Sequence, residues 1–317
     1  MDISVVIVSW NVSDLLRNCL KSIHRDLSGG DGYAVEVFVV DNASTDGTAN
    51  VVRAEFPWVH LIENDQNVGF TRANNQALPL TSGRYILLLN PDTEVLHGAI
   101  RALASYMDSH PDVAVVGPRL QFPDGRVQSS RRRFPRYATG FIESTVLQRY
   151  FPDHRLLREY YIADVPDDQL QEVDWVVGAC MLVRRGSLGT DGLFDERYFM
   201  YSEELDLCYR LKKDGWKVVY NPDATVVHYE ARSSDQDVLG RNVHFHDSKC
   251  KYYGKVYGTW RGQILRTFIL ATYLFQLAEE SMKFVLVSRN RKMRRHRIAV
   301  LAAAAKWHLG QIVSMGG

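Results

Sequence analysis

Four short, largely apolar runs near the start of the chain constrain its fold most strongly. They cover Ile3–Trp10, Val35–Val40, Val59–Glu63 and Tyr85–Leu89. Runs of this length are typical of strands buried on both faces of a parallel sheet, and are short for helices. A segment with helical features follows each run. Four strand–helix units in succession predict an α/β fold with a mostly parallel central sheet, right-handed crossovers and flanking helices.

The last of these runs ends abruptly in a polar turn, Asn90–Glu94. Pro91 cannot donate a hydrogen bond to a neighbouring strand, and Asn90 and Asp92 favour a turn. Open α/β sheets bind their ligands at the carboxyl ends of their strands. A carboxylate held there, such as that of Asp92, could bind a hard cation, and the cation could bind a diphosphate.

The common phosphate-binding loops are missing from this otherwise nucleotide-binding type of fold. No GxGxxG motif follows the first run, and no GxxxxGK[ST] motif occurs. The sequence therefore supports neither a dinucleotide site nor a P-loop. A bound nucleotide would need another counter-charge for its phosphates, which Asp92 and a metal ion could supply.

The composition is that of an ordinary globular protein. The 317 residues are enough to bury a sizeable core. A net charge of +1 creates no global field that selects an acidic partner, so we expect no nucleic-acid partner. The four cysteines form no CxxC metal motif, and a reduced, cytosolic setting is the simpler interpretation. The N-terminus has no basic segment before its apolar run, so we interpret it as a strand rather than a signal peptide.

The pattern changes after a short predicted strand at Val113–Val116. Residues 121–136 are polar and are interpreted as a solvated loop, although their arginines could meet phosphate groups. Residues of about 138–172 have many aromatic and charged side chains but no clean period. We therefore expect an insertion at about residues 130–172 that serves an acceptor or acts as a lid. The arginines are Arg131, Arg132, Arg133 and Arg136.

Val173–Arg184 returns to a strand pattern. Gly178 and Ala179 within it are small enough to let a ligand approach the backbone. The last predicted strand is Ala224–His228. Taken alone, His228 is more often a structural histidine at the edge of a sheet than a ligand.

A cluster of acids follows a run of aromatic residues. Ser202 is a plausible N-cap, which places Glu203, Glu204 and Asp206 in the first turn of a helix. Carboxylates there complement the helix dipole, and Asp206 can pair with Arg210. Three acids are nonetheless more than capping requires, and a general base beside a sugar needs such a setting.

Residues 231–317 differ in character and predict a C-terminal helical region. Ser233–His246 is polar and is interpreted as a flexible loop, with His244 and His246 as weak candidates for phosphate contact. Ile264–Val287 is apolar but interrupted by charges, and its longest uncharged stretch falls short of the roughly 20 residues that span a bilayer. It predicts an amphipathic helix that can lie at an interface.

A basic run with no acid among its members follows this helix. Such a run beside an apolar helix suits anionic phospholipid on the cytoplasmic face of a membrane, so we expect this region to associate with a membrane surface. The alternative is a helical hairpin packed on the catalytic domain or on a second subunit, with a solvated basic turn. The basic residues are Arg289, Arg291, Lys292, Arg294, Arg295 and Arg297.

Seven motifs together resemble the inverting nucleotide-sugar glycosyltransferases of family 2, especially the rhamnosyltransferase-like branch that acts on bacterial cell-surface glycans. The resemblance covers roughly residues 3–230 and implies the GT-A fold. Any one motif is weak, because short motifs recur by chance, but all seven occur in the family's order. They are VVIVSWN at 5–11, VVDNASTDGT at 39–48, NVGFTRANN at 67–75, LLLNPDTEV at 87–95, WVVGACMLVRR at 175–185, GLFDERYFMYSEELDLCYRL at 192–211 and NPDATVVH at 221–228.

The resemblance implies roles for individual residues. Asp92 takes the place of the metal-binding acid of a DxD motif that is only partly present, and His228 matches the second metal ligand. A mixed carboxylate and imidazole set suits Mg²⁺ or Mn²⁺. Glu204 is expected to be the catalytic base, with Glu203 as the alternative, because the family usually has an aspartate at the second position. The expected nucleotide-sugar contacts are Ser9 and Asp41 at the nucleobase, Asn67, Gly69 and Arg72 beside the ribose and base, Asn90 at a hydroxyl, and Gly178 and Ala179.

These roles imply a single in-line displacement with inversion at the anomeric carbon, carried out by a catalytic domain at residues 1–230. The resemblance points to dTDP-rhamnose as donor and to a polyprenyl-diphosphate-linked or other glycan as acceptor. The enzyme would then be cytoplasmic and peripheral on the inner face of the cell membrane, where two copies could form a homodimer. A UDP-hexose donor is an alternative. Two others are a glycoside hydrolase, which uses two carboxylates without a nucleotide, and a non-catalytic module that binds sugar nucleotides or glycans.

Overall fold

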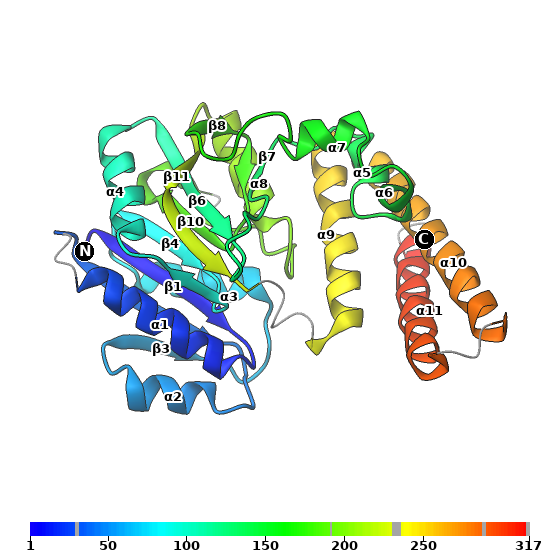
Figure 1. Cartoon of the computed structure of the whole chain (residues 1–317), viewed down its shortest axis with the longest axis horizontal. Helices are drawn as coiled ribbons and strands as arrows, with labels where there is room; N and C mark the ends of the chain where they lie inside the picture. Colours follow the sequence, from blue (N-terminus) through cyan, green and yellow to red (C-terminus); the bar gives the residue numbers. More distant parts are fainter. Residues whose placement is uncertain (29–31, 191, 230–235, 287–289, 315–317) are drawn as a thin grey trace. The chain divides into compact units, whose positions relative to one another are not determined.

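The computed structural model of the chain (Figure 1) contains a large β-sheet with surrounding helices and a group of long helices near the C-terminus. Among the residues that the structure describes, no helix is long and apolar enough to cross a lipid bilayer. The described residues are 1–28, 32–190, 192–229, 236–286 and 290–314.

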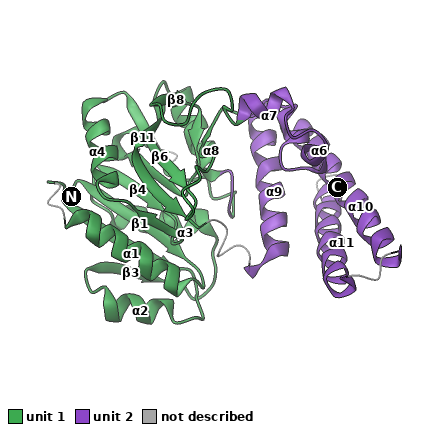
Figure 2. Cartoon of the chain, viewed as in Figure 1, with its two compact units in different colours: residues 1–134, 161–199, 203–233 green, residues 135–160, 200–202, 234–317 purple. Residues whose placement is uncertain are grey.

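The chain divides into two compact units (Figure 2). Unit 1 comprises residues 1–134, 161–199 and 203–233 and contains the sheet. The second unit contains the long C-terminal helices. It also takes up part of the predicted insertion at about 130–172, while the rest of the insertion belongs to unit 1. Unit 2 comprises residues 135–160, 200–202 and 234–317.

The first part of unit 1 alternates strand and helix as the sequence predicts. Its strands are β1 (Ile3–Ser9), β2 (Val35–Asp41), β3 (Val59–Glu63) and β4 (Tyr85–Leu89). They pair in parallel in the order β3-β2-β1-β4, so the strand prediction is confirmed for these four. The helices between and after them are α1 (Ser13–Leu27), α2 (Thr48–Glu55), α3 (Phe70–Ala77) with the 3-10 turn η1 (Leu78–Leu80), and α4 (Ala99–Ser109).

The remaining strands continue the mostly parallel sheet and add three antiparallel members to it. They are β5 (Thr93–Val95), β6 (Val113–Gln121), β8 (Gln171–Val173), β10 (Cys180–Arg184) and β11 (Lys217–His228). β10 runs antiparallel to both β4 and β6, whereas β6 and β11 are parallel, and β5 and β8 pair antiparallel with β11. The apolar pattern of a buried strand does not encode its direction, so the sequence could not show which strands run antiparallel to the others. The predicted α/β class with flanking helices is confirmed.

Four smaller elements complete unit 1. β7 (Arg131–Arg132) and β9 (Trp175–Val176) form a two-stranded antiparallel sheet. The 3-10 turn η2 (Arg185–Ser187) follows β10, and helix α8 (Glu203–Lys213) precedes β11.

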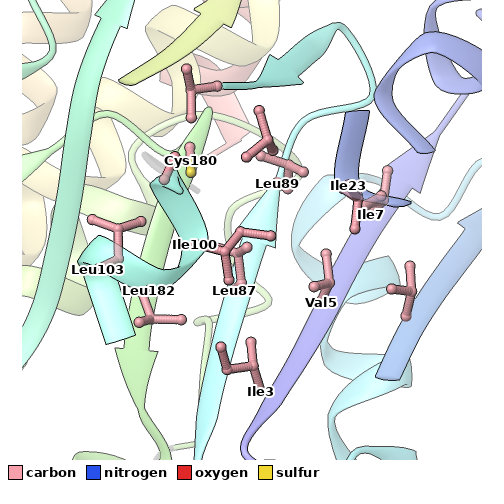
Figure 3. Packing of buried hydrophobic residues seen from close by; sticks show 14 of the residues in the cluster. Ile3, Val5, Ile7, Ile23, Leu87, Leu89, Ile100, Leu103, Cys180 and Leu182 are labelled. Atoms are coloured by element: carbon pink, nitrogen blue, oxygen red, sulfur yellow. The ribbon is translucent and has the colours of Figure 1, made fainter. Parts of the chain in front are cut away.

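One hydrophobic core fills the face of the sheet against which α1 and α4 pack (Figure 3). Fully burying one such aliphatic side chain contributes roughly 1.5–3 kcal/mol relative to leaving it in water. This packing holds the strand ends, and the residues that follow them, in fixed positions. The residues labelled in Figure 3 are Ile3, Val5 and Ile7 of β1, Ile23 of α1, Leu87 and Leu89 of β4, Ile100 and Leu103 of α4, and Cys180 and Leu182 of β10.

Unit 2 consists mainly of helices. They are α5 (Thr139–Ile142), α6 (Val146–Tyr150), α7 (Arg155–Tyr160), α9 (Val238–Tyr257), α10 (Thr259–Leu286) and α11 (Arg291–Ser314). The prediction of a flexible polar loop at Ser233–His246 was wrong from Val238 onward, where α9 begins. Residues 233–235 lie outside the described part of the chain.

The predicted helix at Ile264–Val287 forms the greater part of α10. α10 and α11 pack against each other and against α9. α9 and α10 approach closely at Gly254 and Gly262. A Cβ atom added to Gly262 would lie only 2.8 Å from the Cα of Gly254. Val287 and Arg289, which the sequence placed in the apolar helix and the basic run, lie outside the described residues.

Candidate active site

The carboxyl ends of three parallel strands meet at one edge of the sheet in unit 1. β1, β2 and β4 are adjacent, and Ser9 lies directly opposite Asp41 in the register of β1 and β2. β4 ends at Leu89, so Asn90 starts at this edge. The turn before β10 reaches it as well, because Cys180 pairs with Leu89. We call this region the carboxyl edge.

Ser9 and Asp41 place two polar groups in a buried setting at the carboxyl edge. Ser9 is fully buried, and its Oγ has no hydrogen-bond partner among the described residues. Asp41 is also buried, and its Oδ1 accepts the N–H of Ser44 at 3.2 Å. Leaving a buried polar group without a hydrogen bond costs about 1–3 kcal/mol, so binding of a ligand that forms this hydrogen bond is favoured. The two side chains could bind the polar edge of a nucleobase.

Asn42 organises the loop between β3 and α3, and sequence reasoning did not single it out. Its buried amide donates to Oδ1 of Asn67 at 2.8 Å, and its Oδ1 accepts the N–H of Val68 at 3.0 Å. Oδ1 of Asn67 also accepts the N–H of Gly69 at 3.0 Å. Asn67 therefore shapes the loop through its Oδ1. The position of Asn42 in the motif at 39–48 is the sequence feature that could have identified it.

Gly69 is required by the backbone. Its φ is +88°, a region that favours glycine, and an added Cβ would lie 2.7 Å from the carbonyl oxygen and the ring of Phe199. The N–H of Phe70 donates to this same carbonyl at 2.8 Å. Arg72, in the first turn of α3, is exposed and pairs with Glu196 at 3.3 Å. Close packing is thus a sufficient account of Gly69.

β5 and β11 bring Asp92 and His228 together from distant parts of the sequence. Thr93 pairs with His228 across these antiparallel strands, and the N–H of Tyr229 donates to the carbonyl of Asp92 at 2.9 Å. Nε2 of His228 lies 3.4 Å from Oδ1 of Asp92, and the two side chains are only 8% and 6% exposed. The structure thus places both sequence-predicted metal ligands at one point.

Gln128 holds His228 from the other side. Its Oε1 lies 2.9 Å from Nδ1 of His228, and its Nε2 donates to the carbonyl oxygen of His228 at 2.6 Å. Sequence reasoning missed this residue, because it treated residues 121–136 as a solvated loop. Tertiary folding alone brings Gln128 to β11.

The pair formed by Asp92 and His228 fits a divalent cation. Nε2 of His228 faces a carboxylate oxygen, so either a proton on Nε2 or a metal ion can bridge the two atoms. A carboxylate oxygen with an imidazole nitrogen suits Mn²⁺ and is compatible with Mg²⁺. Within the described ranges, no group of three or more His, Cys, Asp or Glu side chains could hold a metal. The pair would therefore supply two ligands, with substrate phosphates and water supplying the others.

Glu204 belongs to the carboxyl edge through a chain of close contacts. A Cβ atom on Gly178 would lie 3.4 Å from the Cβ of Glu204, so α8 begins against the turn before β10. In the same turn, the carbonyl of Ala179 accepts the N–H of Asn90 at 2.9 Å. The structure thus brings Asn90, Gly178, Ala179 and Glu204 together, as the sequence predicts for one site.

Burial perturbs both acids at the start of α8. Burial raises the pKa of Glu204, and the N–H groups of Gly178 and Leu205 and the charge of Arg132 offset part of this effect. Burial and the charge of Glu204 raise the pKa of Glu203 well above its usual range. Glu203 is the more deeply buried of the two. A partly accessible carboxylate with a raised pKa is suited to general-base catalysis, which favours Glu204.

The third acid of α8 has a structural role. Asp206 is fully buried and pairs with Arg210 at 3.1 Å, which confirms the predicted i,i+4 ion pair. Arg210 also donates to the carbonyl of Leu193 at 2.6 Å. Ser202 directly precedes α8, at the N-cap position that the sequence predicts, and its φ of +64° makes its backbone left-handed.

The predicted arginine cluster separates into different roles. Arg131 is buried and donates to the carbonyl oxygens of residues 165 and 166, both at 2.6 Å, so it anchors a loop. The Arg132 guanidinium lies over the ring of Tyr161, 4.6 Å from its centroid, and its charge lowers the pKa of Glu204. Arg132 therefore acts on Glu204 through its charge.

The histidines proposed as weak phosphate contacts are half-buried in α9 of unit 2. Nδ1 of His246 is 2.8 Å from the hydroxyl of Tyr273, and burial lowers the pKa of His246 to about 4. Burial also lowers the pKa of His244. Both rings are thus neutral near pH 7, which removes the charge that would attract a phosphate.

Sequence comparison identifies the family. A family model described as Glycosyl transferase family 2 matches residues 4–188, more than half of the chain. The chain is 32% identical over 267 residues to the N-acetylglucosaminyl-diphospho-decaprenol L-rhamnosyltransferase of Mycobacterium tuberculosis (strain ATCC 25618 / H37Rv), a match that covers 81% of this chain and 85% of that protein. It is 30% identical over 235 residues to the rhamnosyltransferase WbbL of Escherichia coli (strain K12), covering 71% and 82%.

Solved structures show the same fold. The mannosyltransferase PcManGT from Pyrobaculum calidifontis, in complex with GDP-Man and Mn²⁺, has a TM-score of 0.54 at 18% identity, covering 97% of this chain and 86% of that chain. GalNAc-T7, with UDP, GalNAc and Mn²⁺, has a TM-score of 0.54 at 15% identity, covering 80% and 50%. These likenesses support the predicted GT-A fold. The chain belongs to glycosyltransferase family 2 and is similar to its rhamnosyltransferases.

Proposed function

We propose that this glycosyltransferase moves rhamnose from dTDP-rhamnose to a hydroxyl group of a polyprenyl-diphosphate-linked glycan, with inversion at the anomeric carbon. One observation carries the proposal: Oδ1 of Asp92 and Nε2 of His228 lie 3.4 Å apart in a buried setting, and Asp92 belongs to the turn that follows β4. This pair offers a place for a cation that holds a diphosphate, and Glu204 supplies a base at the same edge. A glycoside hydrolase has no need for such a cation.

The residues of the carboxyl edge have distinct tasks in this reaction. Ser9 and Asp41 hold the nucleobase, and Asn90 accepts or donates a hydrogen bond at a sugar hydroxyl. When bound by Asp92 and His228, the cation supplies positive charge to the diphosphate of the donor. Mg²⁺ and Mn²⁺ both meet this need.

Glu204 carries out the proton transfer. Its carboxylate takes the proton of the acceptor hydroxyl, and the hydroxyl oxygen forms a bond to the anomeric carbon from the side opposite the leaving group. The bond between that carbon and the diphosphate oxygen breaks, and its electron pair leaves with the nucleoside diphosphate. One displacement of this kind inverts the configuration at the anomeric carbon.

Relatives support the choice of donor sugar and acceptor. The Mycobacterium tuberculosis protein is named for a rhamnose donor and for an N-acetylglucosaminyl-diphospho-decaprenol acceptor, and WbbL is named as a rhamnosyltransferase. The nucleobase follows from the family resemblance. A UDP-hexose donor is the competing proposal, because the GalNAc-T7 structure contains UDP with Mn²⁺.

A donor screen tests the proposal. The full-length protein is incubated with Mn²⁺ or Mg²⁺, a polyprenyl-diphosphate-linked N-acetylglucosamine acceptor, and either dTDP-rhamnose or UDP-hexoses. Release of dTDP that depends on both acceptor and cation supports rhamnosyl transfer. Acceptor-dependent release of UDP alone identifies a UDP-hexose enzyme. A protein that binds dTDP-rhamnose but releases no nucleotide with any acceptor is a binding module.

A lipid-linked acceptor requires contact with a membrane, and α10 carries a surface suited to it. Its exposed positions from Ile264 to Leu286 recur at helical spacing and include no charged residue. We call this surface the α10 stripe. It comprises Ile264, Thr267, Ala271, Leu274, Phe275, Ala278, Met282, Val285 and Leu286.

The charged side chains of α10 between these positions are all paired inside unit 2. Arg266 is buried and pairs with Asp247 at 2.7 Å. Glu279 pairs with Arg149 at 3.0 Å and with Lys283 at 2.6 Å. The fourth charged residue, Glu280, pairs with Arg294 at 3.2 Å. The charges are thus used to pack the helices, and the stripe is left apolar.

Positive charge is concentrated where the stripe ends. Met282, Val285 and Leu286 are 58%, 72% and 74% exposed, the last two being the most exposed apolar side chains of α10. The start of α11 follows, with four exposed cations and no acidic residue anywhere in the helix. We call these cations the basic tip. They are Arg291, Lys292, Arg295 and Arg297.

We take the occupant of this surface to be a membrane containing anionic phospholipid. Each cation near such a surface contributes about 1 kcal/mol, and the apolar stripe can lie in the interfacial layer. The α10 stripe of a second copy contains no acidic residue that could pair with the basic tip, whereas anionic phospholipid carries negative charge. Charge complementarity therefore favours lipid. The enzyme would then act as a cytoplasmic, peripheral protein on the inner face of the membrane.

A further inference from the structure

Gln128 contacts His228 with both ends of its amide. Its Nε2 donates to the carbonyl oxygen of His228 at 2.6 Å, and its Oε1 lies 2.9 Å from Nδ1 of the same residue. Gln128 is 9% exposed, so water does not compete freely for these atoms. The two contacts define the orientation of the amide group.

This arrangement determines which ring nitrogen of His228 carries the proton. A carbonyl oxygen only accepts hydrogen bonds, so the NH₂ group of Gln128 must face the carbonyl of His228. Its Oε1, which also only accepts, then faces Nδ1 of the ring. Nδ1 must therefore be protonated and donate to Gln128. In the neutral ring, the lone pair is then on Nε2, which lies 3.4 Å from Oδ1 of Asp92.

A short hairpin delivers Gln128 to this position. After β6, the N–H of Phe122 donates to the carbonyl of Arg126 at 2.8 Å, and Gln121 forms a bridge with Val127. The N–H of Gln128 then donates to the carbonyl of Leu120 at 2.8 Å. The backbone of Gln128 is thus tied to β6, the strand that runs parallel to β11.

We infer that Gln128 is a positioning residue for the metal site: by accepting the Nδ1 proton and binding the backbone of His228, it presents the Nε2 lone pair toward Asp92 for a divalent cation. The inference rests on the proposed function. Histidine ligands commonly donate their other N–H to an oxygen acceptor, and loss of that acceptor lowers metal affinity about 10- to 100-fold. Gln128 acts through His228 and need not touch the substrate.

The experiment compares three variants by cation binding and by NMR. Gln128→Leu removes both contacts with His228 while keeping a side chain of similar size. Gln128→Glu keeps an oxygen that can accept the Nδ1 proton, so it serves as the conservative variant. Gln121→Leu is the matched control, because Gln121 is half-buried in the same hairpin and its backbone pairs with Val227, but its side chain makes no hydrogen bond to His228 among the described residues. Mn²⁺ affinity is measured by calorimetry and electron paramagnetic resonance, and thermal unfolding checks that each variant folds.

NMR reads the histidine directly, without metal or substrate. In ¹⁵N-histidine-labelled, metal-free protein, we expect the His228 signal, identified with His228→Ala, to show a proton on Nδ1 when the ring is neutral. We expect Gln128→Leu to weaken Mn²⁺ binding about 10- to 100-fold, Gln128→Glu to retain most of it, and Gln121→Leu to bind as the unaltered protein does.

The outcomes separate this inference from the proposed function. A neutral His228 protonated on Nε2, or a folded Gln128→Leu variant with unchanged Mn²⁺ affinity, would overturn the inference. If the unaltered protein bound no Mn²⁺, or if His228→Ala bound it equally well, the proposed metal site would be wrong. The protonation state of His228 would in that case still show whether Gln128 sets the tautomer of the ring, but Gln128 would have no metal-positioning role. If Gln128→Leu does not fold, the Gln128→Glu variant and the NMR measurement on the unaltered protein test the inference.

Discussion

Oδ1 of Asp92 and Nε2 of His228 lie 3.4 Å apart, although the two residues flank different strands of the sheet. Antiparallel pairing of β5 with β11 creates this proximity, with Thr93 opposite His228. Both side chains are buried, so the carboxylate and the imidazole interact in a medium that weakens charges less than water does. A cation shared by the two would be held strongly.

Replacing Asp92 by Asn tests this pair with little change in shape. Asn cannot carry the negative charge that a cation needs, so we expect Mn²⁺ affinity to fall at least tenfold, about 1.4 kcal/mol. Mn²⁺-dependent binding of the nucleotide sugar should weaken with it. Calorimetry measures both. Asp124→Asn is the control, because Asp124 is exposed and pairs with Arg126 at the surface. Equal Mn²⁺ affinity in the two variants would remove Asp92 from the metal site.

Glu204 and Glu203 can be separated by matched substitutions. Glu204→Gln keeps the size but removes the base, and we expect the rate of transfer to fall roughly 10²- to 10⁴-fold while donor binding remains. Glu203→Gln removes a more deeply buried carboxyl group, and we expect transfer to continue at a similar rate. Steady-state kinetics and donor titration measure the two effects. The reverse result would assign the base to Glu203.

The pH dependence of transfer follows from the raised pKa of Glu204. Burial raises this pKa from the ordinary value of 4.5, and the base acts in its deprotonated form. The rate should therefore rise with pH through the raised pKa and be lost as pH falls through it, at a higher pH than for an ordinary glutamate. A profile of kcat against pH measures this limb. Because burial is the main cause of the raised pKa of Glu204, the Glu203→Gln variant should keep the same acid limb. An acid limb at or below 4.5 would contradict the assignment.

The strand ends of the site could be predicted because they depend on local pattern. The apolar run Tyr85–Leu89 must be buried, and the polar turn after it must leave the sheet, so Asn90 and Asp92 had to lie at an edge. Pairing Asp92 with His228 needed the family resemblance, since the apolar pattern does not show which strand lies beside β5.

The residues that support the site could not be predicted in the same way. Gln128 belongs to a polar segment without a period, and its role appears only when a hairpin brings it beside β11. The direction of β10 is invisible for a related reason, because a run of buried residues reads the same in both directions. Asn42 had a signal in its motif, but its partners lie in a loop more than twenty residues later.

Gly69 and Gly47 provide a matched pair for backbone strain. Both have positive φ angles, +88° and +86°, but an added Cβ meets Phe199 at 2.7 Å in one and nothing within 4 Å in the other. We expect Gly47→Ala to cost about 1 kcal/mol of unfolding free energy, and Gly69→Ala to cost more because Phe199 must also move. Urea unfolding measures the difference. Equal costs would show that Phe199 yields freely, and the loop at 64–69 would then be less rigid than its bonds indicate.

The α10 stripe and the basic tip predict binding to anionic vesicles. Sedimentation with vesicles of phosphatidylcholine and phosphatidylglycerol should recover the protein, whereas vesicles of phosphatidylcholine alone should recover little. Val285→Glu with Leu286→Glu should abolish binding, because a carboxylate replaces each of the two most exposed apolar side chains of α10. Arg291→Glu with Lys292→Glu should weaken binding and its salt dependence.

Two further measurements separate lipid from a second subunit. Leu80→Glu alters an apolar residue of unit 1 that is 58% exposed, as Met282 of the stripe is, and this variant should bind vesicles as the unaltered protein does. In solution, analytical ultracentrifugation of the Val285 and Leu286 double variant should give the same mass as the unaltered protein. A dimer that the double variant converts to a monomer, together with no vesicle binding by the unaltered protein, would assign the stripe to a subunit interface. The basic tip would then need a different partner, because α11 contains no acid to pair with it across a two-fold axis.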